Sequence, residues 1–137
     1  MNLKWIICTS VVALSLVFAN HAQAQSAQLH ARSLALKSGE TVELRDFYAV
    51  TNCNSILVGM PEITVMEGPP GVTASAVEAM VVPRYFGCPK PVKGAKLRLS
   101  ADKIEDYSQS QAMLRVKYKT KDGDREFSIP VNLTLFP

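Results

Sequence analysis

The sequence predicts an all-β sandwich of about seven antiparallel strands. Apolar and polar residues alternate in short runs, turn-forming residues separate these runs at intervals of roughly ten to fifteen residues, and no later stretch has the period of a long amphipathic helix. Alternation puts every second side chain on one face of a strand, so each run can bury one face and expose the other. Two sheets built from such strands bury their apolar faces by packing together.

The first two predicted strands flank a tight turn. Leu34 and Leu36 alternate with small or polar residues, residues 38–40 read Ser-Gly-Glu, and a second run covers 41–50. Three further runs follow at 63–65, 72–82 and 97–99. The segment Gly-Pro-Pro-Gly at 68–71 separates two of them, because glycine and proline both interrupt regular structure. Residues 101–107 are predicted to form a brief helical turn.

The last two strands are predicted to form a hairpin about Asp122-Gly123, since both residues tolerate the positive φ of a tight hairpin turn. This register places apolar residues opposite apolar ones and lysines opposite carboxylates: Lys121 with Asp124, Lys119 with Glu126, Tyr118 with Phe127, Val116 with Ile129 and Leu114 with Val131. Pro130 lacks an amide donor, so a bulge or an unpaired edge is expected there.

The N-terminus has the pattern of a secretory signal peptide. Lys4 precedes an apolar run over residues 5–19, and Ala-Gln-Ala at 22–24 offers a cleavage site before Gln25. The apolar run of about 15 residues is shorter than the ~20 that span a bilayer, which makes a membrane anchor the weaker alternative. We therefore expect a cleaved signal at 1–24, a flexible tail at 25–31, a domain at 32–137, and a location in the periplasm or outside the cell, with no membrane span after cleavage.

Two cysteines remain after cleavage. Cys8 leaves with the signal, and the pair Cys53 and Cys88 in an exported protein predicts a disulfide. The alternative is a cysteine nucleophile or a thiolate metal site, which needs a nearby histidine. The one histidine left, His30, lies in the predicted tail. Cys53 follows the second strand and Cys88 lies in the loop 83–91, so the bridge is expected near one end of the sandwich.

The sequence contains no motif that is typical of catalysis or cofactor binding. The carboxylates at 105–106 and 122–124 lie in predicted turns, where Asp is common for backbone reasons. The methionines are scattered, and neither a zinc spacing nor a glycine-rich phosphate loop is present. The sequence predicts no enzyme, no catalytic residue, no metal and no cofactor.

A basic row on the predicted hairpin is the first candidate binding surface. Its members, spaced two residues apart on one strand face, are Arg115, Lys117, Lys119 and Lys121. In the predicted register Lys119 and Lys121 meet carboxylates, which leaves Arg115 and Lys117 as candidates for an anionic partner. A solvated surface is the alternative. Nucleic acid is not expected, because the aromatic residues of this hairpin point to the opposite face.

The second candidate binding surface is the loop around Cys88, which combines cations and aromatic rings: Arg84, Tyr85, Phe86 and Lys90. This candidate fails if the two rings are buried in the core. For both surfaces the partner is unknown, and an envelope protein and a polyanionic surface polymer are the classes considered.

Two segments resemble bacterial Ig-like and cadherin-like modules. Residues 63–72 resemble their strand–Pro/Gly turn–strand unit, and residues 114–123 resemble the start of their closing hairpin. With the segments 52–55 and 86–89 around its cysteines, the chain is similar to small exported proteins of Gram-negative bacteria with no assigned activity. The resemblance implies an Ig-like sandwich and an exported location, without a mechanism.

These expectations combine into a non-enzymatic exported binding or interaction module stabilised by one disulfide. Two alternatives remain: a structural subunit of a surface fibre, completed by a neighbour's strand as in pilins, and a proteinaceous inhibitor of a host or envelope enzyme.

Overall fold

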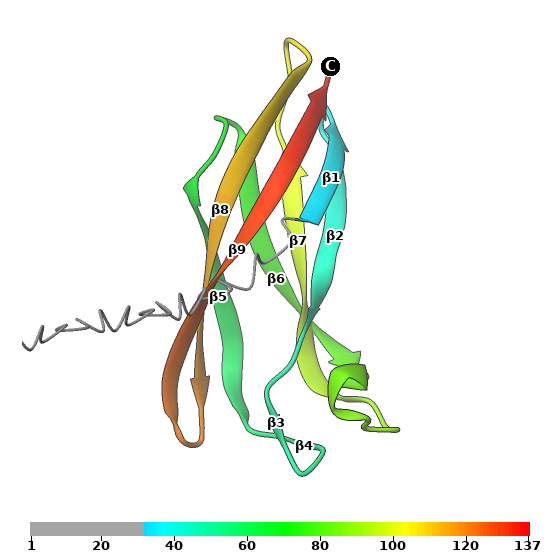
Figure 1. Ribbon diagram of the computed structural model, residues 1–137, viewed down its shortest axis with the longest axis vertical. Coiled ribbons are helices and arrows are strands. Elements are labelled where there is room, and N and C mark those ends of the chain that lie inside the picture. The colour runs from blue at the N-terminus through cyan, green and yellow to red at the C-terminus, as the bar shows by residue number, and fades with distance from the viewer. Residues whose placement is uncertain (1–31) are drawn as a thin grey trace, which may run out of the picture.

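The computed structural model describes residues 32–137, which form two β-sheets packed face to face (Figure 1). The strands are β1 (Arg32–Lys37), β2 (Thr41–Phe47), β3 (Val50–Thr51), β4 (Asn54–Ser55), β5 (Leu57–Glu67), β6 (Val72–Val81), β7 (Val92–Ala101), β8 (Ser108–Thr120) and β9 (Gly123–Phe136). A short 3₁₀ helix, η1 (Arg84–Phe86), lies between β6 and β7. The predicted signal peptide and tail, residues 1–31, lie outside the described residues.

Apart from β1, the strand order is that of an immunoglobulin-like sandwich. The larger sheet has the order β1-β9-β8-β5 and the smaller one β2-β7-β6, while β3 and β4 pair only with each other. Counted without the short β3 and β4, the strands β2, β7 and β6 are the second, fifth and fourth, and they share one sheet. The strands β9, β8 and β5 are the seventh, sixth and third, and they share the other sheet, as in immunoglobulin constant domains. The predicted all-β, Ig-like sandwich of about seven strands is confirmed.

The first strand departs from the antiparallel plan. β1 runs parallel to β9, from Arg32 opposite Val131 to Lys37 opposite Phe136. The other ladders between the described strands are antiparallel, as predicted. β1 thus extends the larger sheet and covers only the C-terminal part of β9.

Period-two burial builds the core between the sheets. On β8 the buried residues are Ala112, Leu114 and Val116, and on β9 they continue from Ile129 in steps of two residues to Leu135. The facing sheet contributes Leu44 and the pair Leu97 and Leu99, all fully buried. Full burial of one such aliphatic side chain contributes about 1.5–3 kcal/mol.

A bulge in β2 breaks this period once. Its pairing with β7 shifts between Glu43 and Arg45, so one extra residue is accommodated on β2. Leu44 and Phe47, three residues apart, consequently both reach the core. The same shift places Glu43 and Asp46 on one outer face, where both contact Lys96.

The predicted register of the β8–β9 hairpin is wrong by two residues. Thr120 pairs with Gly123, so Lys121 and Asp122 form the turn instead of Asp122 and Gly123. The Thr120 hydroxyl accepts a hydrogen bond from the Asp122 N–H (3.2 Å) and donates one to the Gly123 carbonyl (2.8 Å), which stabilises this turn. A shift of two residues preserves which face each side chain occupies, and the predicted core residues of the hairpin are therefore still inside.

Pro130 lies at an edge that is unpaired among residues 32–137, and an unpaired edge was one of the two outcomes predicted for it. The β8–β9 ladder passes Pro130 without a register shift, and β1 pairing begins only at Val131. The Ser38 N–H donates to the Phe136 carbonyl (2.9 Å), so Phe136 directs its backbone groups toward β1. Direction alternates along a strand, and Pro130, six residues earlier, faces that same side. Its missing N–H therefore removes no hydrogen bond from the ladder with β8.

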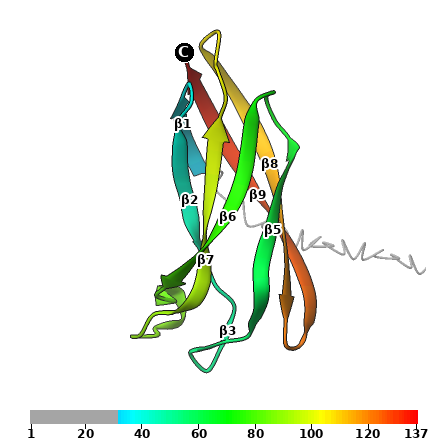
Figure 2. The ribbon, with the colours of Figure 1, turned by 180° about the vertical axis from the view of Figure 1, so that it is seen from behind.

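In the loops, the predicted helical turn at residues 101–107 is wrong and the predicted disulfide is confirmed. Residues 102–107 form no helical turn; the helical turn of the described chain is η1. Cys53, in the β3–β4 turn, and Cys88, after η1, form the predicted disulfide with a Cα–Cα distance of 5.5 Å. Figure 2 shows β3 and η1 at the same end of the sandwich, where the bridge was expected.

No helix within residues 32–137 has the length and apolar character needed to cross a membrane.

Candidate functional site

A cleft of about 520 Å³ opens at the disulfide end of the sandwich, between β2 and the β8–β9 hairpin. We call it the aromatic cleft, and its lining consists of Arg45, Asp46, Phe47, Tyr48, Tyr85, Phe86, Tyr118 and Phe127. Six of these are aromatic, whereas residues 32–137 contain eight aromatic side chains in all. The remaining two, Tyr107 and Phe136, pair with each other 5.3 Å apart and take no part in the cleft. The aromatic residues are thus concentrated at one end of the molecule.

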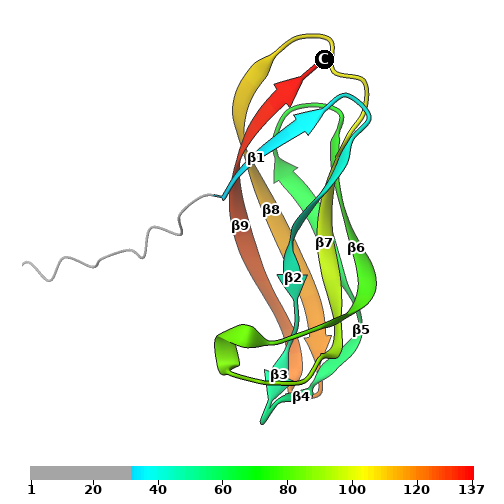
Figure 3. The same cartoon turned by 90° about the vertical axis from the view of Figure 1, so that its right-hand side faces the viewer.

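Among residues 32–137, β1 pairs with only part of β9, and the cleft lies beside the rest of that strand. Figure 3 shows β1 beside the C-terminal part of β9, with the rest of β9 extending beyond it toward the β3–β4 end. Pairing with β1 stops at Val131. In that direction the space between β2 and β9 is lined by aromatic rings, with no described strand across it.

Three packed rings form the inner wall. Phe47, only 4% exposed, lies 4.9 Å from the Tyr118 ring in an edge-on arrangement and 6.0 Å from the Phe127 ring in a stacked one. The rings of Tyr118 and Phe127 are themselves 6.0 Å apart. Aromatic pairs in these geometries contribute about 0.5–1.5 kcal/mol beyond the area they bury. This wall is anchored in the core and does not need a ligand to hold its shape.

The outer wall is exposed. Phe86 meets Tyr48 at 6.1 Å and Tyr85 at 5.2 Å, both edge-on. Tyr85 is 86% exposed and Phe86 60%. Large apolar side chains grouped at one exposed place on a small protein characteristically mark a contact site for another molecule.

The loop that carries these two rings is held in place by its neighbours. Cys88 is buried and bonded to Cys53, and Pro83 before η1 is fully buried. Gly87 ends η1 in the left-handed conformation (φ 68°), and its N–H donates to the Arg84 carbonyl at 3.0 Å. A ligand that binds to a fixed backbone loses less conformational entropy than one that must order a flexible loop.

Two charged residues of β2 lie at the cleft. The Arg45 guanidinium stands 5.2 Å from the centre of the Phe127 ring, within the range of a cation–π contact. The bulge in β2 places Arg45 immediately after the shifted position, and such bulges commonly redirect a side chain. Asp46 accepts a hydrogen bond from Lys96 at 3.2 Å. The cleft therefore combines an apolar body with a few polar groups, which is the usual composition of ligand sites.

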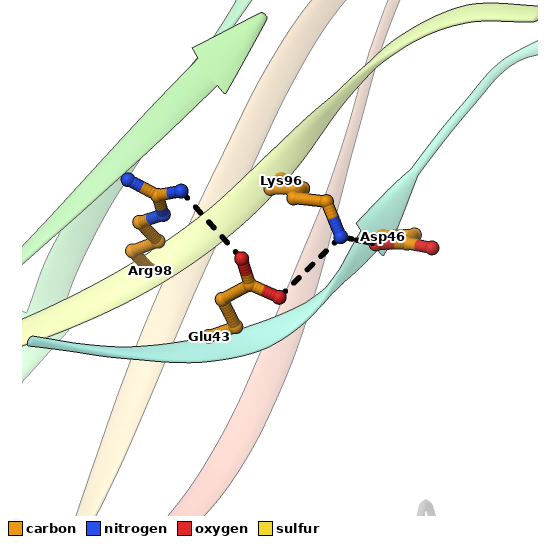
Figure 4. Close-up of polar contacts among 4 residues, drawn as sticks. All are labelled: Glu43, Asp46, Lys96 and Arg98. Carbon is orange, nitrogen blue, oxygen red and sulfur yellow. Dashed lines mark hydrogen bonds and ion pairs between the residues drawn. The ribbon is translucent and has the colours of Figure 1, made fainter. Parts of the chain in front are cut away.

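Asp46 also belongs to a charge cluster on the outer face of the smaller sheet. Lys96 contacts Asp46 at 3.2 Å and Glu43 at 3.4 Å, and Arg98 contacts the other Glu43 oxygen at 3.5 Å (Figure 4). Hydrogen bonds that Lys96 donates, first to Asp46 and then to Glu43, raise the pKa of Lys96 above its ordinary value of 10.5. This cluster thus pairs two cations with two carboxylates and carries no net charge.

Of the four candidate residues in the disulfide loop, two line the aromatic cleft and two do not. Tyr85 and Phe86 are exposed, as that prediction required, and both line the aromatic cleft. Arg84 and Lys90 are also exposed, but neither is among the cleft residues.

The hairpin candidates Arg115 and Lys117 lie elsewhere, on the outer face of the larger sheet. In the observed register Lys117 stands opposite Glu126 on β9 and Glu62 on β5, while Arg115 stands opposite Ser128 and Thr64. The expectation that Lys117 has no carboxylate across from it rested on the wrong register. Arg115 alone of the two has no acidic residue directly opposite it.

A second hollow of about 460 Å³ lies on this side of the hairpin, lined by Met60, Glu62, Lys117, Tyr118, Lys119, Asp124, Arg125 and Glu126. Three basic side chains there face three acidic ones. This balance does not favour a polyanion over other ligands.

Phe47, Tyr48 and Phe127 were not predicted from the sequence as members of one site. A signal was present at residues 47–48, where two adjacent rings end an alternating run, so that one must leave the core face. That Phe127 lies beside this pair could not be predicted from the sequence, because it depends on which part of β9 pairs with β1.

In comparisons with protein-family models, with curated proteins and with solved structures, no match to this chain was found. Within residues 32–137, no group of three or more His, Cys, Asp or Glu side chains is arranged to hold a metal ion.

Proposed function

We propose that this protein is an exported, non-enzymatic binding module that recognises its partner through the aromatic cleft. The observation that carries the proposal is the concentration of six aromatic side chains at one end, with Tyr85 and Phe86 exposed on a loop held by a disulfide. Exposed aromatic rings on a fixed backbone supply contact area at low entropic cost. A disulfide is typical of oxidising compartments, which supports a location in the periplasm or outside the cell.

The cleft favours an apolar or aromatic group as ligand. Its walls are rings, and Arg45 and Asp46 supply the charges. Arg45 stacks on Phe127, and Asp46 is hydrogen-bonded to Lys96. Neither acid–base nor nucleophilic catalysis is suggested by this set, because no second carboxylate and no histidine lines the cleft.

The fibre-subunit alternative is less well supported. A subunit completed by a neighbour lacks its own final strand, whereas β9 is present here and pairs with both β1 and β8. No observation favours the inhibitor alternative over binding in general.

The test is a selection of ligands followed by a matched pair of variants. A random heptapeptide library and a panel of oligosaccharides are the probes, and each ligand found is titrated against wild type, Phe86→Ala and Tyr107→Ala. Tyr107 is the control because it is 55% exposed and forms a similar ring pair with Phe136 at the other end. We expect Phe86→Ala to weaken binding at least tenfold, about 1.4 kcal/mol, and Tyr107→Ala to leave it unchanged. Ligands that bind all three proteins equally would refute the proposal.

A further inference from the structure

β9 has an edge beside the aromatic cleft that none of the described strands covers. The described part of β1, which starts at Arg32, pairs with β9 from Val131 onward, whereas β9 begins at Gly123 and is paired with β8 from Gly123 to Leu135. Residues 124–130 therefore keep one side of the backbone unpaired among residues 32–137. An uncovered strand edge presents a row of donors and acceptors that can pair with a further strand.

The backbone groups available on this edge follow from the direction of Phe136. Its carbonyl accepts from Ser38 on the β1 side, so the even-numbered residues of β9 direct their backbone groups to that side. In the uncovered stretch these are Asp124, Glu126, Ser128 and Pro130. The edge thus offers the amide N–H groups of the first three residues and four carbonyl oxygens, spaced as an extended strand requires.

The side chains of the same stretch connect the edge to the cleft. Phe127 lines the aromatic cleft, and Ile129, two residues further along the same face, is buried in the core. On β1, Leu34 and Leu36 point into the core from the adjacent position in the sheet. A strand that continued the position of β1 would place every second side chain among the rings of the cleft.

We propose that residues 124–130 of β9 form a docking edge for an extended polypeptide segment, which adds to the larger sheet as a strand and inserts an apolar side chain into the aromatic cleft. The proposal rests on the proposed function and specifies the chemical class of the partner. Unpaired backbone amides beside an apolar pocket favour a polypeptide over a glycan, because strand addition uses main-chain hydrogen bonds for affinity and pockets for alternate side chains. The edge also prolongs a ladder that β1 already forms with β9.

A second copy of this chain is a poorer occupant of the edge. Antiparallel pairing of two copies about Glu126 would set the Glu126 carboxylates of the two copies side by side, and like charges across a strand pair are destabilising. Pro130 also offers no N–H at the end of the edge. Charged residues and proline are the features with which edge strands avoid pairing with their own copies.

The test uses a heptapeptide selected from a random library, since seven residues extend over about 23 Å at ~3.3 Å per residue, the length of the uncovered stretch. Two versions of the peptide are N-methylated on alternate sets of amides. One set faces β9 in any strand pairing and the other faces away, so we expect one version to bind at least tenfold more weakly and the other to bind as the parent does. A peptide in which both methylated versions bind equally well would refute strand addition.

Hydrogen exchange gives a second readout that does not depend on a variant folding. The amides of Glu126 and Ser128 are expected to exchange rapidly in the free protein and at least tenfold more slowly with the peptide bound. Slow exchange of both amides without peptide would mean that the edge is already covered, and the inference would be wrong.

Two further results separate this inference from the proposed function. If Phe86→Ala abolishes peptide binding while neither methylated version is impaired, the cleft binds ligand and strand addition fails. If only oligosaccharides bind, a polypeptide partner is excluded. If the protein dimerises through residues 124–130, the occupant of the edge is a second copy and the inference is wrong. If Phe86→Ala changes the binding of no ligand, the proposed function itself fails.

Discussion

The two ends of the sandwich are closed by different means. At the end opposite the cleft, three connections are hydrogen-bonded to one another: Gly39 N–H to the Asp102 carbonyl (3.2 Å), Asp102 N–H to the Gly71 carbonyl (2.8 Å) and Ile104 N–H to the Ser38 hydroxyl (2.8 Å). At the cleft end, the Ser55 hydroxyl donates to the Lys93 carbonyl (3.0 Å) and the Lys121 N–H to the Ile56 carbonyl (3.0 Å), and a covalent bond between Cys53 and Cys88 is added to these hydrogen bonds.

The difference follows from what each end exposes. The far end carries one aromatic pair, Tyr107 and Phe136, while the cleft end leaves Tyr85 and Phe86 exposed and surrounds them with further rings. Exposed side chains bury little apolar area and therefore contribute little to the stability of the fold. A disulfide supplies stability without using that surface, because it acts chiefly on the unfolded chain.

Among the variants that test this difference between the two ends, removal of the disulfide is expected to change the free energy of unfolding most. The variant Cys53→Ala/Cys88→Ala should lower the free energy of unfolding by about 3–4 kcal/mol, as estimated from loop-closure entropy for a separation of 35 residues. Urea denaturation measures this loss. Hydrogen exchange should then increase more around residues 52 and 88 than around residues 39 and 102, and an equal increase at both ends would contradict the assignment of the bridge to one end.

A control separates the bond from the backbone that carries it. Cys53 has φ 61°, in the left-handed region that favours glycine. The variant Cys53→Gly/Cys88→Ala should therefore be about 0.5–1 kcal/mol more stable than the double alanine variant. Equal stabilities would mean that the turn does not keep this conformation without the bond.

Gly94→Ala should disturb the floor of the cleft. Gly94 is buried, and a Cβ there would overlap the Phe47 carbonyl oxygen and lie 2.6 Å from a Val81 methyl group. Such overpacking costs about 1–3 kcal/mol, and here it must displace the Phe47 backbone. Thermal unfolding and ligand titration should both show the loss. The exposed β6 residue Ser75, changed to alanine, should alter stability by less than about 0.5 kcal/mol; if Gly94→Ala changes no more than this, the close packing is wrong.

Ser38→Ala tests the far end and should cost about 1 kcal/mol, because it removes the partly buried hydrogen bond to Ile104. The matched change Ser33→Ala, on exposed β1 surface, should cost less than half of that. Chemical denaturation compares the two. A loss as large as that of the disulfide variant would mean that one hydroxyl, and not the shared hydrogen-bond network, closes this end.

The smallest effect is expected at the charge cluster. The pKa of Lys96 is raised in the folded protein, so its contribution to stability is complete below 10.5 and is lost as the pH rises through the higher folded value. The difference in Tm between wild type and Lys96→Gln should therefore narrow as the pH rises beyond 10.5 and through the folded pKa. Lys103→Gln, in a more exposed ion pair with Glu105, serves as the control. A difference that persists unchanged at high pH would show that Lys96 stabilises through its alkyl chain.

The sequence was most informative where local patterns decide the structure. The alternation around Leu34, Leu114 and Val131 predicted the strands and their inward faces, and the cysteine count predicted the bridge. The hairpin turn was misplaced because Asp122-Gly123 is a strong local signal, whereas the Thr120 hydroxyl stabilises a turn one residue earlier. The prediction of which side chains point inward remained correct, because the register was wrong by two residues, an even number.

Contacts between segments far apart in the sequence could not be predicted from local patterns. Nothing in residues 32–37 shows that β1 pairs in parallel with β9, or that this pairing stops at Val131. The aromatic cleft depends on that end point and on rings from β2, η1 and the last hairpin, which lie far apart in the sequence. Tyr85 and Phe86 could be predicted as exposed members of the site because the sequence places both in a loop.

The most direct test of binding at the aromatic cleft is an NMR titration of the ¹⁵N-labelled protein with the selected heptapeptide. Amide shifts should change at residues 45–48, at 84–88 and along 124–130, while the amides of Gly39, Gly71 and Asp102 stay in place. Shift changes centred on the Gly39–Asp102 end, with the cleft amides unaffected, would contradict the account.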